Sequence, residues 1–168
     1  MPLSEGTDLV APAVARAADL TPRARVAKID PDLADTATFC DTYDVALEAS
    51  ANCVVVLGRR GDRETRAAVM VLATDRADIN KVVRKELDAR KVSFADQSET
   101  EELTGMTSGG ITPLGLPEDW VVLVDQGVVD AGPVVIGGGV RGSKIILDGA
   151  DLADLPQARV LDLALPRD

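Results

Sequence analysis

Gly105-Met-Thr-Ser-Gly-Gly-Ile-Thr-Pro-Leu-Gly115 lies between a short acidic segment and an apolar one, and it decides how the chain can fold. Four glycines and a proline in eleven residues predict a tight, irregular loop, because glycine accepts positive φ and Pro113 fixes its own φ. Such a loop can direct several peptide N–H groups at one point, which suits a phosphate or a developing oxyanion. The same pattern also fits a plain turn between two packed elements.

Short runs rich in valine and isoleucine recur along the chain and predict strands, several of them apolar enough to be covered on both faces. These runs are residues 53–57, 68–73, 92–95, 120–124, 133–136, 144–147 and 160–163. Gly58–Asp62 predicts a hairpin turn between the first two.

Helical patterns lie between these runs and complete the predicted fold. Helices are expected over 38–48, over 78–90 with Asp75 as cap, from a Ser98/Glu101 capping box to a stop at Gly105, and over 151–155. The sequence therefore predicts a mixed α/β (α+β) single domain over 23–165, with flanking helices and one mixed or largely antiparallel sheet of about six to seven strands. Residues 1–22 are expected to be an N-terminal extension, either helical or frayed.

Composition excludes several classes of protein. The chain has 168 residues, enough for one domain with a sizeable core, and with 2% aromatic residues that core must be aliphatic. Histidine is absent, which excludes Ser–His and Cys–His catalytic pairs and histidine zinc sites. Cys40 and Cys53 form no CxxC motif and are expected to be small buried residues, and we expect no metal. The sequence shows neither a membrane-spanning run nor a signal peptide, so we expect a cytoplasmic protein.

Charge is distributed unevenly along the chain. The net charge is −10, yet ten of the 18 basic residues lie between Gly58 and Lys91, among them Lys81, Arg84 and Lys85. This basic region could contact a phosphate backbone, although a solvated helix face explains it equally well. Asp125, directly after an apolar run, could face a pocket or simply form a turn.

A second glycine cluster, Gly137–Gly139, follows an apolar run and precedes Arg141. Consecutive glycines after a strand indicate a bulge or a close approach between two backbones. The two glycine loops, in this order, resemble the YbaK/EbsC family, the ProX-like editing domains associated with prolyl-tRNA synthetase. The matched pieces include Ala51-Asn-Cys-Val-Val-Val56, the loop Gly109–Gly115, the run ending at Asp125 and Gly137–Gly139 with Arg141, and they cover roughly residues 25 to 163.

The resemblance implies hydrolysis of the ester between a wrong amino acid and its tRNA, without metal or cofactor. In that family a GxxxP loop, matched here by Gly109–Pro113, holds the acyl group, and a ribose hydroxyl of the tRNA is thought to help activate water. Many members carry a lysine where this chain has Asn52. The resemblance therefore makes Asn52 a candidate catalytic residue, together with Gly109 and Gly110 of the matched loop. The remaining candidates for substrate binding are Ile111, Thr112, Pro113, Gly115, Asp125, Gly137, Gly138 and Gly139.

The leading hypothesis is therefore an aminoacyl-tRNA deacylase that acts in trans on a small mischarged amino acid. Arg141, Lys81, Arg84 and Lys85 are the candidate tRNA contacts. The implied partners are the aminoacylated 3′ end of tRNA and, as a further candidate, an aminoacyl-tRNA synthetase; neither DNA nor a membrane is expected. One alternative is a non-catalytic module of the same fold that recognises a charged tRNA end, a nucleotide or a synthetase. Asn52 would then only cap a strand end. Another alternative is a hydrolase of a different small acyl ester.

Overall fold

The fold was established from a computed structural model, which describes residues 1–167. Its strands are β1 (Arg25–Lys28), β2 (Ala51–Arg60), β3 (Arg63–Leu72), β4 (Asp75–Ala77), β5 (Lys91–Phe94), β6 (Val121–Asp125), β7 (Pro133–Gly137), β8 (Ser143–Asp148), β9 (Ala158–Leu161) and β10 (Ala164–Pro166). Its α-helices are α1 (Pro12–Arg16), α2 (Thr36–Thr42), α3 (Arg84–Glu86), α4 (Gln97–Thr104), α5 (Gln126–Asp130) and α6 (Gly149–Leu152). The predicted mixed α/β single domain is confirmed, and each of the seven expected strands is present.

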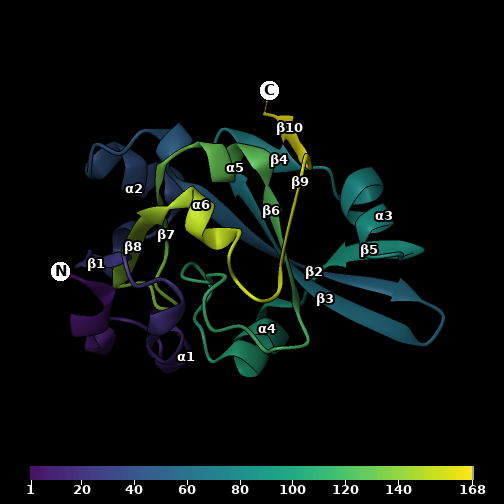
Figure 1. Cartoon of the computed structure of the whole chain (residues 1–168), viewed down its shortest axis with the longest axis horizontal. Coiled ribbons are helices and arrows are strands. Elements are labelled where there is room, and N and C mark those ends of the chain that lie inside the picture. The colour runs from purple at the N-terminus through teal and green to yellow at the C-terminus, as the bar shows by residue number, and fades with distance from the viewer. Residues whose placement is uncertain (168) are drawn as a thin grey trace.

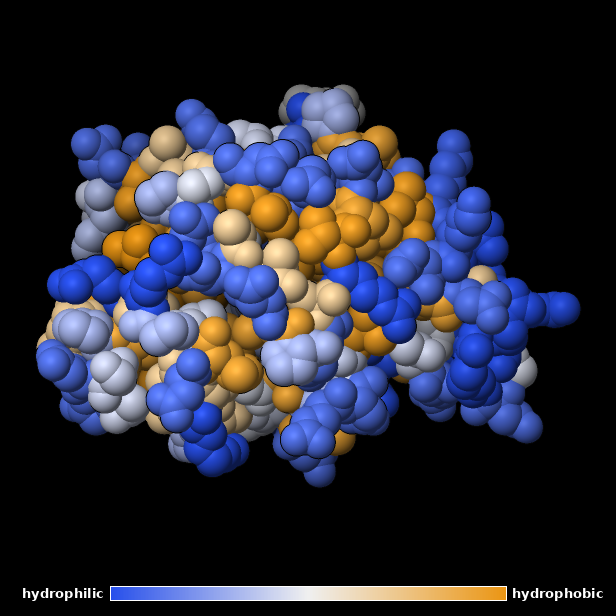
Figure 2. All heavy atoms as spheres, viewed as in Figure 1, coloured by the Kyte–Doolittle hydropathy of each residue, from blue (hydrophilic) through white to orange (hydrophobic). Residues whose placement is uncertain are grey.

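The largest sheet is built around a long antiparallel hairpin. Its order is β5-β2-β3-β6-β9, in which β5, β2 and β3 run antiparallel while β3, β6 and β9 run parallel. The hairpin turn lies at Gly61 and Asp62, so both strands extend beyond the predicted turn through Gly58. Hydrophilic side chains cover the end of the molecule from which this hairpin projects (Figures 1 and 2).

The other strands form two separate sheets, whereas the sequence predicted a single sheet. β1-β8-β7 is a three-stranded antiparallel sheet, and β10-β4 is a two-stranded one (Figure 1). The physical reason is packing, since β7 and β8 bury apolar side chains against β2, β3 and β6 in one shared cluster, instead of extending the larger sheet sideways. A single parallel bridge between Ser50 and Val135 joins the two sheets at the start of β2.

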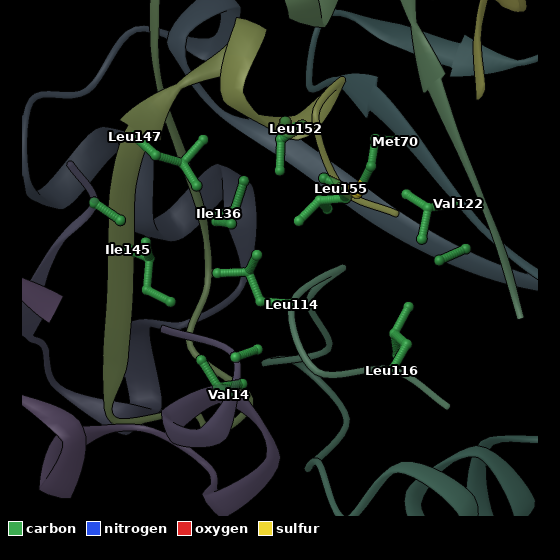
Figure 3. Packing of buried hydrophobic residues seen from close by; sticks show 14 of the residues in the cluster. Val14, Met70, Leu114, Leu116, Val122, Ile136, Ile145, Leu147, Leu152 and Leu155 are labelled. Carbon is green, nitrogen blue, oxygen red and sulfur yellow. The ribbon is translucent and has the colours of Figure 1, made fainter. Parts of the chain in front are cut away.

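The main core lies between these two sheets. It combines Met70 and Val122 from the large sheet with Ile136 and Ile145 from the three-stranded one. Leu114, from the glycine-rich loop, is fully buried among them (Figure 3). The loop is therefore anchored in the core by the residue that follows Pro113.

The first 22 residues pack against the same core. They form α1 and short 3₁₀ turns at Leu3–Glu5, Thr7–Leu9 and Ala18–Leu20. Leu3 and Val14 are buried in the main cluster, and the Ala11 N–H donates to Gly138 O at 3.0 Å. The expected extension is thus a structural part of the domain.

Several helix ends differ from their predicted positions. α2 ends at Thr42, where 38–48 was expected, and Asp44 adopts a positive φ of 55° before a 3₁₀ turn at Leu47–Ala49. The predicted 78–90 helix is a π turn, Ile79–Val83, followed by α3. Asp78, rather than Asp75, caps it by accepting the Lys81 N–H.

The caps of the later helices also moved by a few residues. Asp96 caps α4 by accepting the Glu99 N–H at 2.8 Å, so the predicted Ser98/Glu101 box is wrong, whereas Gly105 ends the helix with a φ of 71°, as predicted. Asp148 begins α6 at Gly149, ahead of the expected 151–155. Asp side chains outcompeted the predicted caps because an aspartate placed just before the first turn accepts its N–H groups directly.

Two glycine loops make direct backbone contact with each other. Gly139 N–H donates to Gly110 O at 2.7 Å, and Thr107 N–H donates to Gly139 O at 2.9 Å. A Cβ on Gly110 would lie 2.5 Å from Val140 O, and one on Gly137 would lie 2.6 Å from Gly110 O. Any larger residue at Gly110 or Gly137 would force the two backbones apart.

Gly110→Ala is expected to lower the free energy of unfolding by roughly 2–4 kcal/mol, because its methyl group would overlap backbone atoms that cannot move aside. Gly142→Ala is the matched control, since the nearest atom to its Cβ is Pro31 Cγ at 3.7 Å. That variant should stay within about 0.5 kcal/mol of the parent. Urea unfolding followed by far-ultraviolet circular dichroism measures both values, and equal stability of the two variants would contradict the close contact.

Candidate active site

A cavity of about 430 Å³ opens where the two main sheets meet, and we call it the junction pocket. Its walls come from the first half of β2, the N-terminal turns of α2 and α4, the glycine loop and the β7–β8 sheet. The residues that line it are Thr36, Ala51, Asn52, Cys53, Val54, Val55, Phe94, Ala95, Gln97, Thr100, Ser108, Gly109, Ile111, Gly137 and Lys144. Five of the predicted site residues therefore come together here: Asn52, Gly109, Ile111, Gly137 and, through its backbone contact behind Gly137, Gly110.

One wall of the pocket is an unpaired strand edge. β3 pairs with β2 along Ala51–Arg60, whereas β5 pairs only with Val56–Arg59. Val55 O still accepts the Ala95 N–H at 3.0 Å, and beyond it the edge is open. Because peptide groups of alternate residues point to opposite edges, the N–H and C=O of Cys53 point to this open side. The pocket thus offers a backbone acceptor and donor to a ligand.

The glycine loop contributes further peptide groups, though not all those expected. Gly110 N–H donates to Thr107 O at 2.9 Å and is used within the loop itself. The N–H groups of Gly109 and Ile111 have no acceptor among the described residues. The loop is held against α4 by the Ser108 N–H, which donates to Glu101 Oε2 at 2.7 Å. Two residues that line the pocket therefore have peptide N–H groups with no acceptor in the described part of the chain.

Asn52 lies at the start of β2 and is half-buried. Thr36 Oγ1 donates to Asn52 Oδ1 at 2.7 Å, which orients the amide. The Asn52 NH₂ group has no acceptor among residues 1–167, so it can donate to a ligand. The hydrogen bond from Thr36 therefore fixes the orientation of the Asn52 amide at the edge of the pocket.

Lys144 was not predicted from the sequence, yet its side chain lines the pocket. It stands on β8 directly opposite Gly137, and its ammonium lies 5.0 Å from the centre of the Phe39 ring. Burial lowers the pKa of Lys144 below the usual lysine value. The signal that could have revealed it is a lysine inside an otherwise apolar run, Lys144–Leu147, of a covered sheet.

Other predicted site residues support the pocket from behind and do not line it. Thr112 and Pro113 are buried, and a Cβ on Gly115 would overlap the backbone of Ala13. Gly138 packs on Ser143, and Gly139 packs on α1 through Ala11. These residues hold the two loops together, and their small size serves packing.

Asp125 serves the fold at the far end of β6. Its buried carboxylate accepts N–H groups from Gly127, Leu163 and Ala164, at 3.0, 3.0 and 3.2 Å. Its side chain ties β6, α5 and the C-terminal strand β10 together, away from the residues of the junction pocket.

The predicted tRNA contacts divide between two places. Arg141 lies against the glycine loop, where its guanidinium occupies the space a Cβ on Gly109 would need, and its Nε–H donates to Pro31 O at 3.1 Å. Lys81, Arg84 and Lys85 line a different, shallow hollow together with Arg60 and Asp88. Arg141 therefore adjoins the pocket, whereas the basic helix forms a separate positive surface.

Neither cysteine is set up as a nucleophile. Burial raises the pKa of the Cys53 thiol to about 12, and it also raises the pKa of Cys40. Both are free thiols that stay protonated near neutral pH. Within residues 1–167 there is no group of three or more His, Cys, Asp or Glu side chains that could hold a metal ion. Helices in that part of the chain are too short and too polar to cross a bilayer.

The fold and the pocket define a single-domain protein of the aminoacyl-tRNA editing class. Residues 30–155 match the sequence profile of the aminoacyl-tRNA editing domain, so the chain belongs to that family. The matched region contains every residue that lines the junction pocket.

Solved structures have the same fold. The crystal structure of a hypothetical protein is 25% identical, with a TM-score of 0.74 over 84% of this chain and 91% of that one. The crystal structure of a candidate trans-editing enzyme for prolyl tRNA synthetase is 19% identical, with a TM-score of 0.77 over 93% of this chain and 99% of that one. A scaffold protein used for epitope backbone grafting is also 19% identical, with a TM-score of 0.78 over 92% and 97%.

Asp125→Ala is expected to destabilise the protein by roughly 3 kcal/mol, because three N–H groups lose a buried charged acceptor. Asp119→Ala is the matched control, since Asp119 is exposed and accepts no hydrogen bond among the described residues. Urea unfolding of both variants gives the comparison. An Asp125→Ala protein as stable as the parent would contradict the structural role.

Alkylation tests the state of the pocket thiol. Iodoacetamide at pH 8 should modify Cys53 roughly a thousandfold more slowly in the folded protein than in urea, because a thiol of pKa about 12 is almost entirely protonated there. Peptide mass spectrometry after timed quenching measures the two rates. Rapid labelling of Cys53 in the folded protein would show that its thiolate is stabilised after all.

Proposed function

We propose that this protein is an aminoacyl-tRNA deacylase that acts in trans, with the junction pocket as the site that holds the acyl group. The observation that carries the proposal is the coincidence of the family match with the pocket. The glycine–proline loop supplies residues of one wall, and the N–H groups of its Gly109 and Ile111 have no acceptor among residues 1–167.

The reaction needs a positioned ester and a water molecule. The oxygen of water attacks the carbonyl carbon, and the electrons of the C=O double bond move to the carbonyl oxygen, which becomes an oxyanion. When this intermediate collapses, the bond to the ribose oxygen breaks and that oxygen takes the proton given up by water. The products are a free amino acid and a free 3′ end, so no external oxidant or reductant is required.

The chain supplies positioning and hydrogen-bond donors for these steps. The Gly109 and Ile111 N–H groups and the Asn52 amide are free to bind the carbonyl oxygen or the ribose, and donors aimed at a developing charge lower the barrier. A ribose hydroxyl of the substrate fits the role of activating the water, because the chain contains no histidine and its pocket thiol is protonated.

Selection in this proposal works by size. Cys53, Val55 and Ile111 supply the apolar surface of the pocket against which the side chain of the amino acid would pack. A pocket of fixed size rejects larger groups by steric exclusion, while smaller ones enter, as in the second step of double-sieve editing.

Turnover of mischarged tRNAs tests the proposal. The parent protein is expected to hydrolyse at least one member of a panel of tRNAs charged with alanine, serine, threonine or cysteine. Asn52→Ala should lower kcat/KM for that member by roughly 10–100-fold, because a positioned donor is lost. Asn80→Ala is the matched control, an exposed asparagine outside the junction pocket, and it should leave kcat/KM unchanged.

Three outcomes would decide between the alternatives. Salt-sensitive binding of tRNA without turnover would replace the deacylase by a binding module. Hydrolysis of a simple acyl ester, with every tRNA in the panel untouched, would point to another esterase. Equal turnover by the parent and Asn52→Ala would remove Asn52 from the site but leave the deacylase in place. Urea unfolding of each variant confirms that it is folded.

A further inference from the structure

Lys144 carries a positive charge that the protein itself does not neutralise. Its side chain is 8% exposed, and no carboxylate among residues 1–167 lies within ion-pair distance of its ammonium. No hydrogen-bond acceptor for it occurs among those residues either. A largely buried charge without a partner in the protein costs free energy, and an anionic group bound in the pocket would offset that cost.

The titratable and charged groups around Lys144 come from α2 and from the loop before β8. The Phe39 ring and the Cys40 thiol come from α2, and the thiol is neutral near pH 7 because burial raises its pKa. Asp35, at the start of α2, is exposed and acts on Lys144 only at long range. Arg141, on the loop before β8, repels the ammonium. The side open to the ammonium is therefore the junction pocket.

We propose that Lys144 is a catalytic residue of the junction pocket, whose ammonium binds the carbonyl oxygen of the aminoacyl ester as that oxygen becomes an oxyanion. The inference rests on the proposed deacylase function. It extends that function by placing the charge stabilisation on β8, in the same cavity that Asn52 lines from the start of β2.

The position of Lys144 favours the acyl carbonyl over a tRNA phosphate as its partner. Lys144 is 8% exposed and lines the junction pocket beside Gly137, so a group that pairs with its ammonium must enter the pocket. A phosphate of the nucleic acid stays near solvent, where half-exposed Arg141 lies against the glycine loop. The substrate's own α-ammonium is repelled by Lys144, and the open edge of β2 at Cys53 provides the acceptor it needs.

This assignment also accounts for Asn52. An amide donates hydrogen bonds but carries no charge, so Asn52 by itself cannot neutralise an oxyanion. With Lys144 in the same cavity, a second lysine at position 52 would place two like charges in one pocket, where each disfavours the charged form of the other. An uncharged residue at position 52 is therefore compatible with a charged one at position 144.

Steady-state kinetics of Lys144→Met give the first test. Because the interaction forms as charge develops, kcat should fall about 100-fold, while KM stays within about twofold. Lys144→Arg should keep part of the activity, and Lys28→Met is a control that removes an exposed lysine outside the junction pocket. If Lys144 had only a structural role, Lys144→Met would lose stability as well as activity. We expect the opposite for stability: Lys144→Met should unfold at the same or a higher urea concentration, because it removes an unpaired buried charge.

Moving the positive charge from position 144 to position 52 gives a sharper test. If the reaction needs a positive charge in the cavity, the Asn52→Lys/Lys144→Met double variant should have a kcat at least tenfold higher than Lys144→Met alone. The same Asn52→Lys change in the parent should give no gain, since the cavity then holds two lysines. An Asn52→Met/Lys144→Met double variant is the control for changes in shape, and it should recover nothing.

Ligand binding tests the residue without relying on turnover. The probes are two non-hydrolysable alanyl-adenosine analogues: a 3′-phosphonate, which mimics the anionic tetrahedral intermediate, and a 3′-amide, which mimics the neutral ester. By calorimetry, Lys144→Met should weaken phosphonate binding about 100-fold and leave amide binding within about twofold.

The possible outcomes distinguish a failure of the role of Lys144 from a failure of the proposed deacylase function. If the parent deacylates tRNA and Lys144→Met matches it in kcat and in phosphonate binding, the role of Lys144 is refuted and the deacylase stands. A rise in KM with unchanged kcat would refute the oxyanion role in favour of a ground-state contact. If the parent hydrolyses no tRNA, the proposed function fails, and selective loss of phosphonate binding would still support an anion-binding Lys144.

Discussion

The carbonyl oxygen of Gly110 accepts the N–H of Gly139 at 2.7 Å, and the rest of the structure depends on this contact between two loops. One loop leaves α4 and enters the core through Leu114, while the other joins β7 to β8. Their backbones touch because Gly110 and Gly137 have no side chains to hold them apart. The contact fixes the three-stranded sheet against the large one, and the junction pocket is the space left between them.

The pocket combines a rigid frame with unused polar groups. β2 pairs with β5 only from Val56 to Arg59, so its edge is open where the cavity begins, and the glycine loop adds two N–H groups that have no acceptor among residues 1–167. Leaving such groups unpaired is costly inside a protein, and they are tolerated where a ligand or water can satisfy them. Lys144 likewise has no partner in the described part of the chain, but its ammonium carries a full positive charge. A pocket that selects only by size would not need such a charge.

Much of the fold could be predicted from the sequence because local rules governed it. The seven predicted strands are present, and Gly105 ends α4, since valine-rich runs and a glycine stop are read within a few residues. The caps were less predictable, because Asp78, Asp96 and Asp148 compete with neighbours that have similar side chains. The site was predicted in part: Asn52, Gly109, Ile111 and Gly137 do line one cavity, whereas Asp125 and Gly139 have packing and capping roles.

The sequence by itself determined the mixed α/β class, the position of both glycine loops and the absence of histidine chemistry, because each depends on residue type and short spacing. Only the tertiary structure decided that the strands divide between sheets, that residues 1–22 pack into the core and that Lys144 and Asn52 line one cavity. These facts depend on which apolar faces bury each other. Residues 92 positions apart in the chain, such as Asn52 and Lys144, meet only after those faces have packed.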